Sequence, residues 1–250
     1  MRNILLIILL LLCFKGYSQQ NLYTFNNGIL YPLKEIKLFV ESMQKRIPPG
    51  YEMVPTIYHK DFVKDTTINY IRFSSSKKSS NVSTKDSEFT YKQDSTFLLL
   101  KKSLPVFQLT DMNGVKVSSS SLLGKPTLIN FWAIWCGPCI KEMPELSRLK
   151  EKYKDQMNFI SITENDSVLD SLKAFLQNKD FNYPVLDNGE SYKKLLKIGS
   201  LPANLFIDRK GIVRYVQGNY PMSNEGVPLA LESKDNFFNT IINKLLKETR

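Results

Sequence analysis

Buried strands and amphipathic helices alternate along the C-terminal part of the chain. Residues 127–133 (TLINFWA) are an apolar, β-prone run, as is typical of a buried parallel strand. The segment that follows has apolar residues at helical spacing, at Ile140, Met143, Leu146 and Leu149. The same patterns predict strands at 157–163 and 212–216, and helices at 168–177, 192–197 and about 237–247. This alternation predicts an α/β fold in which helices flank a mixed sheet.

The first hundred residues show a different pattern. Apolar positions at 36, 39, 40, 43 and 47 indicate an amphipathic helix, which Pro48 and Pro49 end. Strands are predicted at 53–59, 66–73 and 89–100, with a loop rich in serine and lysine at 74–87. A chain of 250 residues can hold one full domain and a smaller one. We therefore expect a small α+β domain of unknown function at 19–102, a candidate for docking, before a larger domain at 103–250.

Two cysteines stand where the buried strand meets the following helix, in the sequence Trp135-Cys136-Gly137-Pro138-Cys139. Cys136 is predicted at the start of the helix, where unpaired N–H groups and the positive end of the helix dipole favour a thiolate. Cys139 lies one turn later on the same face, from which it can attack a mixed disulfide formed at Cys136. This spacing predicts a site that exchanges disulfides.

A zinc site and a structural disulfide are the alternatives for this pair. Zinc takes four cysteine or histidine ligands, and beyond the pair the mature chain offers only His59. A structural disulfide usually closes a longer loop, because a short loop restricts the unfolded chain little. The redox interpretation is favoured, and no metal site is expected.

The basic balance of the chain, 34 lysines and arginines against 24 acids, adds no nucleic-acid signal. The charges are scattered, and the compact basic runs are as short as Lys77-Lys78 and Lys101-Lys102. We interpret them as solvated surface.

The chain resembles the thioredoxin superfamily, and specifically its periplasmic TlpA/ResA-like branch, over roughly residues 103–248. The motifs that carry the resemblance are Phe131-Trp132-Ala133, Trp135 to Cys139, and Glu142-Met143-Pro144-Glu145-Leu146. Residues 104–109 match the opening strand of the family, and an Asn113-Gly114 turn leads back into 115–117 as a hairpin. The resemblance implies a thioredoxin-like mixed sheet flanked by helices, preceded by the small N-terminal appendage.

The resemblance also implies a substrate groove beside the cysteines. Pro202 would form a cis peptide bond with Leu201 and face the cysteine pair, which leaves the Leu201 backbone free to pair with an extended substrate. A trans proline in an ordinary loop is the alternative. Trp135 is predicted to pack beside the thiol and shape the docking surface.

Glu142 is the third catalytic candidate. Thioredoxins proper have a buried Asp in the strand before the motif, whereas this chain has Asn130, which cannot take a proton. The resemblance implies that Glu142, three residues after Cys139, serves as the general base for that thiol. A solvated glutamate on the helix surface is the alternative, and both remain open.

The first 18 residues have the pattern of a cleavable signal peptide. Arg2 precedes an apolar core at 4–14, and Gly16 and Ser18 are the small residues before the predicted cleavage site. The core is shorter than the roughly 20 apolar residues that span a bilayer. Export to the periplasm or cell envelope is therefore expected. A lipoprotein anchored at Cys13 ranks second, because the preceding residue is not small.

These features predict a cell-envelope thiol–disulfide oxidoreductase that reduces protein disulfides, with a role in cytochrome c maturation as the resemblance implies. Export compartments are oxidising, so a membrane thiol-electron donor is expected to keep the dithiol reduced. No cofactor is predicted, and the protein is expected to be a monomer. A thiol peroxidase and a non-catalytic thioredoxin-fold binding module are the alternatives.

Overall fold

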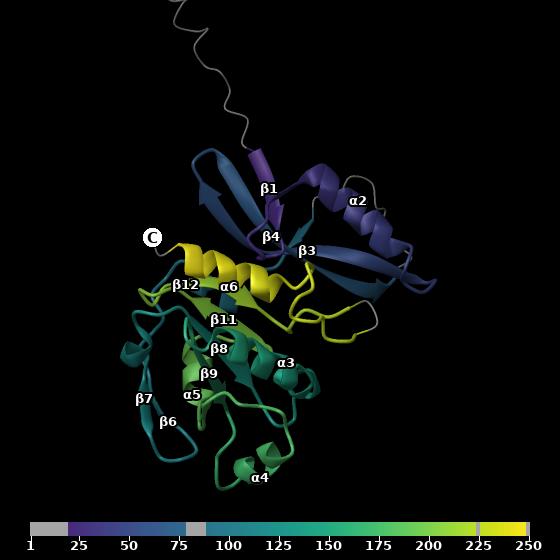
Figure 1. The fold of residues 1–250 in the computed structure, drawn as a ribbon. Helices are drawn as coiled ribbons and strands as arrows, with labels where there is room; N and C mark the ends of the chain where they lie inside the picture. Colours follow the sequence, from purple (N-terminus) through teal and green to yellow (C-terminus); the bar gives the residue numbers. More distant parts are fainter. Residues whose placement is uncertain (1–19, 79–88, 224–225, 249–250) are drawn as a thin grey trace, which may run out of the picture. The chain divides into compact units, whose positions relative to one another are not determined.

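A computed structural model describes residues 20–78, 89–223 and 226–248 (Figure 1). The predicted signal peptide at 1–18 lies outside the described residues. The chain forms two compact units. One consists of the segment that ends at Phe25 together with Ile29–Lys92, and the other of Asn26–Gly28 together with the chain from Gln93 onward.

The described residues of the first unit form a five-stranded sheet and one helix. Its sheet has the order β2-β1-β4-β3-β5, formed by β1 (Gln20–Thr24), β2 (Tyr31–Pro32), β3 (Tyr51–Val63), β4 (Thr66–Lys77) and β5 (Thr90–Tyr91). Helix α2 (Leu33–Gln44) buries Ile36 in a core with Tyr23, Ile57 and Ile71. The predicted α+β appendage is confirmed.

The strand predicted at 89–100 is wrong for most of its length. Thr90 and Tyr91 pair with β3, but Ser95–Leu99 form a 3-10 helix, η1. Asp94 begins that helix, because its side chain accepts the N–H of Thr96 at 3.0 Å. A local bond of this kind competes with strand pairing. Strand β4 also continues to Lys77, into the loop predicted at 74–87.

The second unit is built on a mixed five-stranded sheet of order β10-β9-β8-β11-β12. Its strands are β8 (Thr127–Trp132), β9 (Asn158–Thr163), β10 (Val185–Leu186), β11 (Ala203–Ile207) and β12 (Val213–Gln217). Strands β8, β9 and β10 are parallel, whereas β11 runs antiparallel to both β8 and β12. Every residue of β8 is buried, as its apolar sequence predicts.

Four helices accompany this sheet among the described residues (Figure 1). They are α3 (Gly137–Tyr153), α4 (Leu172–Gln177), α5 (Glu190–Leu195) and α6 (Phe237–Lys247). The predicted mixed sheet with flanking helices is confirmed. A short hairpin of β6 (Gln108–Thr110) and β7 (Lys116–Ser118) precedes η2 (Ser119–Leu122), a 3-10 helix that leads toward β8.

Two element predictions in this unit need correction. The opening strand predicted at 104–109 forms a ladder only from Gln108 onward, and Pro105 has no N–H to donate to one. The helix predicted at 168–177 begins at Leu172. The carboxylate of Asp166 accepts the N–H groups of Val168 and Leu169 at 2.8 and 2.7 Å and holds them in a turn instead.

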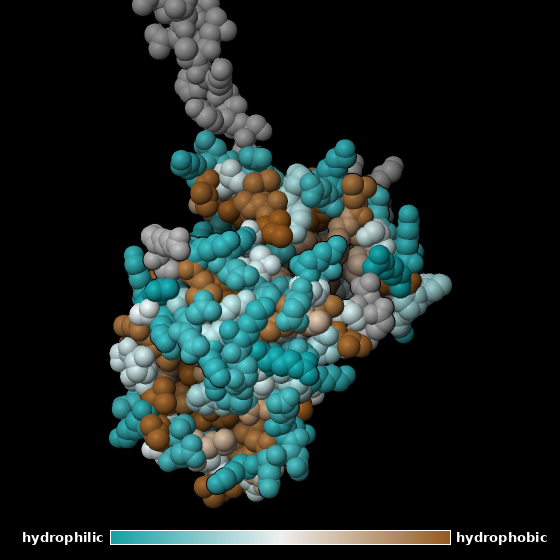
Figure 2. Space-filling view, in the orientation of Figure 1, coloured by the Kyte–Doolittle hydropathy of each residue, from teal (hydrophilic) through white to brown (hydrophobic). Residues whose placement is uncertain are grey.

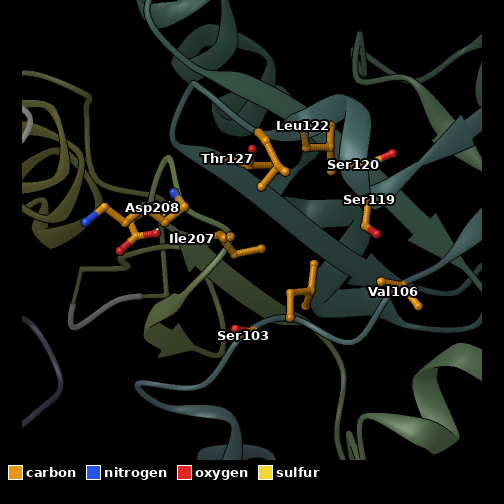
Figure 3. A pocket seen from close by; sticks show the side chains of 12 residues that line it. Ser103, Val106, Ser119, Ser120, Leu122, Thr127, Ile207 and Asp208 are labelled. Atoms are coloured by element: carbon orange, nitrogen blue, oxygen red, sulfur yellow. Dashed lines mark hydrogen bonds between the residues drawn. The ribbon is translucent and has the colours of Figure 1, made fainter.

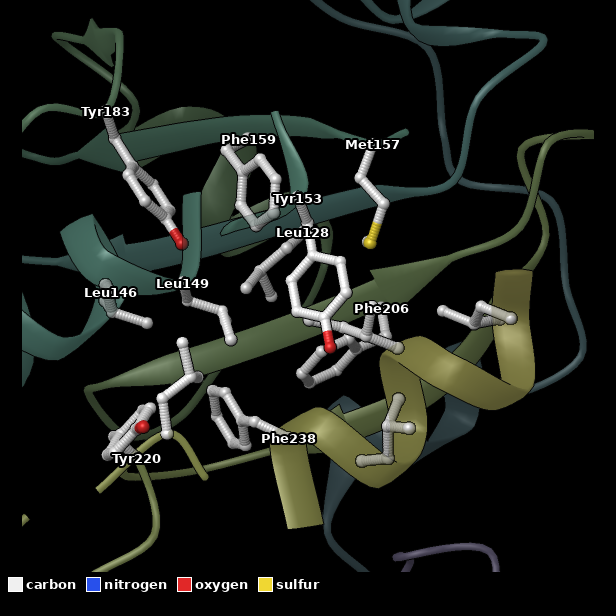
Figure 4. Close-up of a cluster of buried hydrophobic side chains, with 14 residues drawn as sticks. Leu128, Leu146, Leu149, Tyr153, Met157, Phe159, Tyr183, Phe206, Tyr220 and Phe238 are labelled. Atoms are coloured by element: carbon white, nitrogen blue, oxygen red, sulfur yellow. The ribbon is translucent and has the colours of Figure 1, made fainter. Parts of the chain in front are cut away.

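A large hydrophobic core fills the space between the sheet and helices α3 and α6 (Figure 4). Phe206 of β11 and Phe238 of α6 meet edge to face with their ring centroids 4.9 Å apart, and neither side chain is exposed. Leu146 and Leu149 of α3 are buried in the same cluster. The apolar spacing of the two helices is therefore explained by one shared core.

Replacing Phe238 with alanine should destabilise the protein by about 3–5 kcal/mol, because it leaves a cavity that the packed core cannot fill. Urea unfolding of the oxidised protein measures this loss. Phe237→Ala is the matched control, because Phe237 precedes Phe238 on the same helix and is only partly buried. Equal losses in the two variants would contradict the central position of Phe238.

Candidate active site

The two cysteines lie where β8 ends and α3 begins. Cys136 is the residue before the first turn of α3, and its Sγ accepts the N–H of Cys139 at 3.3 Å. Cys136 and Cys139 form a disulfide, with their Cα atoms 5.3 Å apart. Both are buried, whereas Gly137 and Pro138 between them are exposed. The spacing of the motif thus places both sulfurs at the positive end of a 17-residue helix.

The Leu201–Pro202 peptide bond is cis, in agreement with the prediction. Strand β11 starts at the next residue, Ala203, which pairs with Phe131 of β8. Because the strands are antiparallel, the start of β11 lies at the end of β8 from which the cysteine motif continues. Leu201 packs against the apolar cluster that contains Cys136 and Cys139. The structure therefore brings this turn and the cysteine pair together.

Trp135 is the exposed member of the motif, with 67% of its surface accessible. Its indole N–H donates to Glu164 Oε1 at 2.9 Å, and Glu164 also pairs with Lys193. The loop after β9 therefore fixes the orientation of this exposed side chain.

The same loop holds the backbone before the cysteines. Asn165 Oδ1 accepts the N–H of Ile134 at 3.0 Å. Neither Glu164 nor Asn165 was expected from the sequence. Their signal is the polar run that follows a buried strand parallel to β8, since such strands end at the same edge of a sheet.

Apolar residues extend the exposed surface near this loop. Val168 and Leu169, which precede α4, are 81% and 86% exposed. Figure 2 shows apolar surface at the end of the second unit where α4 lies. Leu172, the first residue of α4, is buried in the same cluster as the two cysteines. Exposed aliphatic side chains therefore belong to a loop that is anchored beside the disulfide.

Glu142 is completely buried, so its interpretation as a solvated surface residue is wrong. Its Oε1 accepts the side-chain N–H of Asn130 at 2.9 Å, and its Oε2 accepts the backbone N–H of Tyr220 at 2.7 Å. Burial raises the pKa of Glu142 to about 8, against the opposing effect of these hydrogen bonds. The carboxyl can therefore change its protonation state close to neutral pH.

Asn204 of β11 completes the surroundings of Glu142 and was not identified from the sequence. Its Oδ1 accepts a hydrogen bond from Asn130 at 3.0 Å, and its Nδ2 lies 3.4 Å from Glu142 Oε1. The signal for both asparagines is an amide side chain within a fully buried strand that, apart from Thr127 at the start of β8, is apolar.

Cavities near both ends of the sheet are found among the described residues of the second unit. One of about 150 Å³ is lined by Thr127 and Ile207 and therefore lies at the other end of the sheet from the cysteines (Figure 3). A more polar one of about 390 Å³ is lined by Asp111, Met112 and Asp187. Met112 packs against the cluster that holds the cysteines, so this second cavity borders the active-site region.

The part of the chain that the structure describes has neither a metal-binding cluster nor a membrane-spanning helix. The described residues contain no group of three or more His, Cys, Asp or Glu side chains arranged to hold a metal ion. Within 20–78, 89–223 and 226–248, no helix has both the length and the apolar character needed to cross a bilayer.

The comparisons with known proteins agree with this geometry. The model of the AhpC/TSA family matches residues 100–216. The thiol-disulfide oxidoreductase ResA of Bacillus cereus (strain ZK / E33L) is 35% identical over 121 residues, which cover 48% of this chain and 70% of that protein. The chain belongs to the ResA family of thiol-disulfide oxidoreductases.

Two further similarities concern the same part of this ResA-family chain. ResA of Geobacillus kaustophilus (strain HTA426) is 30% identical over 142 residues, which cover 56% of this chain and 80% of that protein. A crystal structure of a putative thiol:disulfide interchange protein DsbE from Chlorobium tepidum has a TM-score of 0.49 and 22% identity, and the match covers 58% of this chain and 95% of that one. The protein is a thiol-disulfide oxidoreductase with a thioredoxin-like fold.

Proposed function

We propose that Cys136 is the nucleophile and Cys139 the resolving thiol in the reduction of protein disulfides. The observation that carries this proposal is the Cys136–Cys139 disulfide at the first turn of α3. In the reduced protein, the Cys136 thiolate attacks one sulfur of the substrate disulfide and releases the other as a thiolate. Cys139 then attacks Cys136 Sγ and releases the second substrate thiol. The substrate gains two electrons, and the enzyme disulfide forms.

Glu142 is the proposed base for the second step. Cys139 must lose its proton before it attacks, and residues three apart on a helix have their Cβ atoms about 5–6 Å apart. Glu142 is such a neighbour of Cys139, and a pKa of about 8 allows it to accept a proton near neutral pH. Asn130 takes no part in this transfer, because an amide cannot accept the proton.

Glu142→Gln should slow reduction of a protein disulfide about 10²-fold or more near neutral pH, as expected when a general base is removed. The rate of insulin reduction across pH measures this effect. Glu145→Gln is the matched control, because Glu145 is a buried acid one turn further along α3 that pairs with Arg148. A Glu142→Gln variant with the wild-type pH profile would exclude the proposed base.

The proposed substrates are proteins with exposed disulfides, among them the haem-site cysteines of apocytochrome c. The support is the surface beside the disulfide, where Trp135 and the aliphatic pair Val168 and Leu169 offer apolar contact to a polypeptide. The Leu201 backbone would pair with the substrate strand. Trapping mixed disulfides in cells with Cys139→Ser identifies the substrates, and an absence of apocytochrome c among them would exclude that assignment.

The proposed setting is the cell envelope, where a membrane thiol-electron donor returns the monomeric enzyme to its dithiol form. The support is the signal-peptide pattern at residues 1–18. Fractionation of cells, followed by the redox state of Cys136 and Cys139 in each fraction, tests this setting. A reduced cytoplasmic pool of the uncleaved chain would contradict it.

The alternative functions predict different results in the same assays. A thiol peroxidase would consume hydrogen peroxide with a thiol donor. Reduction of a protein disulfide through Cys139 is not part of that activity. A binding module would retain its partners in a Cys136→Ser, Cys139→Ser double variant and would not reduce insulin. Among these functions, the buried Cys136–Cys139 disulfide at the start of the helix favours that of a protein-disulfide reductase.

A further inference from the structure

A chain of oriented side-chain amides ends at the Glu142 carboxyl. The carbonyl oxygen of Gly218 accepts a hydrogen bond from Asn204 Nδ2 at 2.6 Å. Asn204 Oδ1 in turn accepts one from Asn130 Nδ2 at 3.0 Å, and Asn130 Nδ2 also donates to Glu142 Oε1 at 2.9 Å. Both asparagines are buried, and they come from the adjacent strands β8 and β11.

The carbonyl of Gly218 fixes the direction of this chain. A carbonyl oxygen only accepts, so Asn204 must turn its NH₂ group toward Gly218 and its oxygen toward Asn130. Asn130 must then turn its own NH₂ group toward both Asn204 and Glu142. The amide orientations therefore follow from the network itself.

We propose that Asn204 positions the donors around Glu142: it keeps the Asn130 N–H group directed at Glu142 and adds a longer bond of its own, with Nδ2 3.4 Å from Oε1, so that this buried acid can exist as a carboxylate. The proposal deepens the proposed function, because it rests on Glu142 as the base that receives the proton of Cys139. Asn130 and Asn204 donate to Oε1 of Glu142, and the backbone N–H of Tyr220 donates to Oε2. Both carboxyl oxygens therefore accept hydrogen bonds. Donors of this kind favour the charged form of an acid.

Removing the Asn204 amide should reverse this preference, because Glu142 loses the Nδ2 donor and Asn130 loses the oxygen that orients it. Asn130 would then be free to turn its own oxygen toward Glu142, and an acceptor at that place stabilises the protonated acid. The pKa of Glu142, which is about 8 in the intact network, should rise further.

Other titratable groups face Glu142 from several elements. They are Tyr183 before β10 and Tyr220 after β12, while Cys139 and Glu145 are the titratable residues three positions away from Glu142 on α3. The pKa of Tyr220 is raised to about 12 by burial, and burial and the charge of Glu142 raise that of Tyr183 well above its usual value. Both phenols therefore stay neutral below about pH 10. The two cysteines do not titrate in the oxidised protein.

The test is a titration of the Glu142 carboxyl carbon by ¹³C NMR in the oxidised protein, with the resonance assigned by its loss in Glu142→Gln. Asn204→Leu, which preserves the side-chain shape, should raise the midpoint by about one pH unit. Asn130→Leu should raise it at least as much. If leucine prevents folding, Asn204→Ala removes the same acceptor with a smaller side chain.

Ser161→Ala is the matched control. Ser161 is buried in β9, next to β8, but its hydroxyl bonds Pro184 O and not Glu142. The control should leave the Glu142 midpoint unchanged. An unchanged midpoint in Asn204→Leu, or an equal shift in Ser161→Ala, would overturn the positioning role.

Kinetics separate this inference from the proposed function. In the reduced enzyme, Asn204→Leu should lower the rate of insulin reduction about tenfold near neutral pH, with recovery at higher pH, and should have no such effect in a Glu142→Gln background. If Glu142→Gln alone leaves the wild-type pH–rate profile unchanged, the role of Glu142 as a base fails, and the NMR midpoint still decides the role of Asn204.

Discussion

Cys136→Ser should reduce the rate of disulfide reduction to that of the uncatalysed exchange, whereas Cys139→Ser should accumulate as a mixed disulfide with its substrate. The difference follows from the positions of the two sulfurs. Cys136 stands at the N-terminus of α3, where free N–H groups and the helix dipole favour a thiolate. Cys139 lies within the helix, where it is buried and bonded to the sulfur of Cys136.

Insulin reduction and mass spectrometry of the trapped species measure the two outcomes. Brief labelling of the reduced protein with iodoacetamide at neutral pH provides a second readout, in which Cys136 should react first. The fold should tolerate either substitution, because a disulfide between residues three apart constrains the unfolded chain little. Faster labelling of Cys139, with trapping by Cys136→Ser, would reverse the two roles.

The oxidised protein should become less stable as the pH rises from about 4.5 to about 8, with a total loss on the order of 3–5 kcal/mol from Glu142. The pKa of this acid is raised from 4.5 to about 8 by burial in the folded state. Between these two values the folded protein retains a proton that the unfolded chain has released. The stabilisation is therefore complete at low pH and is lost as the pH passes through the folded pKa.

Urea unfolding of the oxidised protein at several pH values tests this expectation without interference from the thiols. Glu142→Gln should abolish most of the slope, because glutamine does not ionise. A slope that persists in Glu142→Gln would assign the pH dependence to other groups.

The fold of the second unit could largely be predicted from local patterns. The apolar run of β8, the helical spacing of α3 and α6, and the turn at Asn113-Gly114 each depend on neighbours in sequence. Predictions failed where a side chain bonded the nearby backbone. Asp94 ended an expected strand, and Asp166 delayed the start of α4, in each case through a local bond that hydrophobic periodicity does not reveal.

The sequence by itself determined the cysteine pair and its place between a buried strand and a helix, because both depend on a short continuous motif. The cis bond before Pro202 was expected from the family resemblance, with a trans bond left open, and the structure shows it to be cis. Only the tertiary structure decided the state of Glu142. Helical spacing places this residue one turn after Cys139, but it does not say what covers that face. Asn204 and Tyr220, 62 and 78 residues further along the chain, cover it and supply donors to its carboxyl. A pKa depends on such long-range burial and hydrogen bonding, so the chemistry of Glu142 emerges only when the sheet has formed.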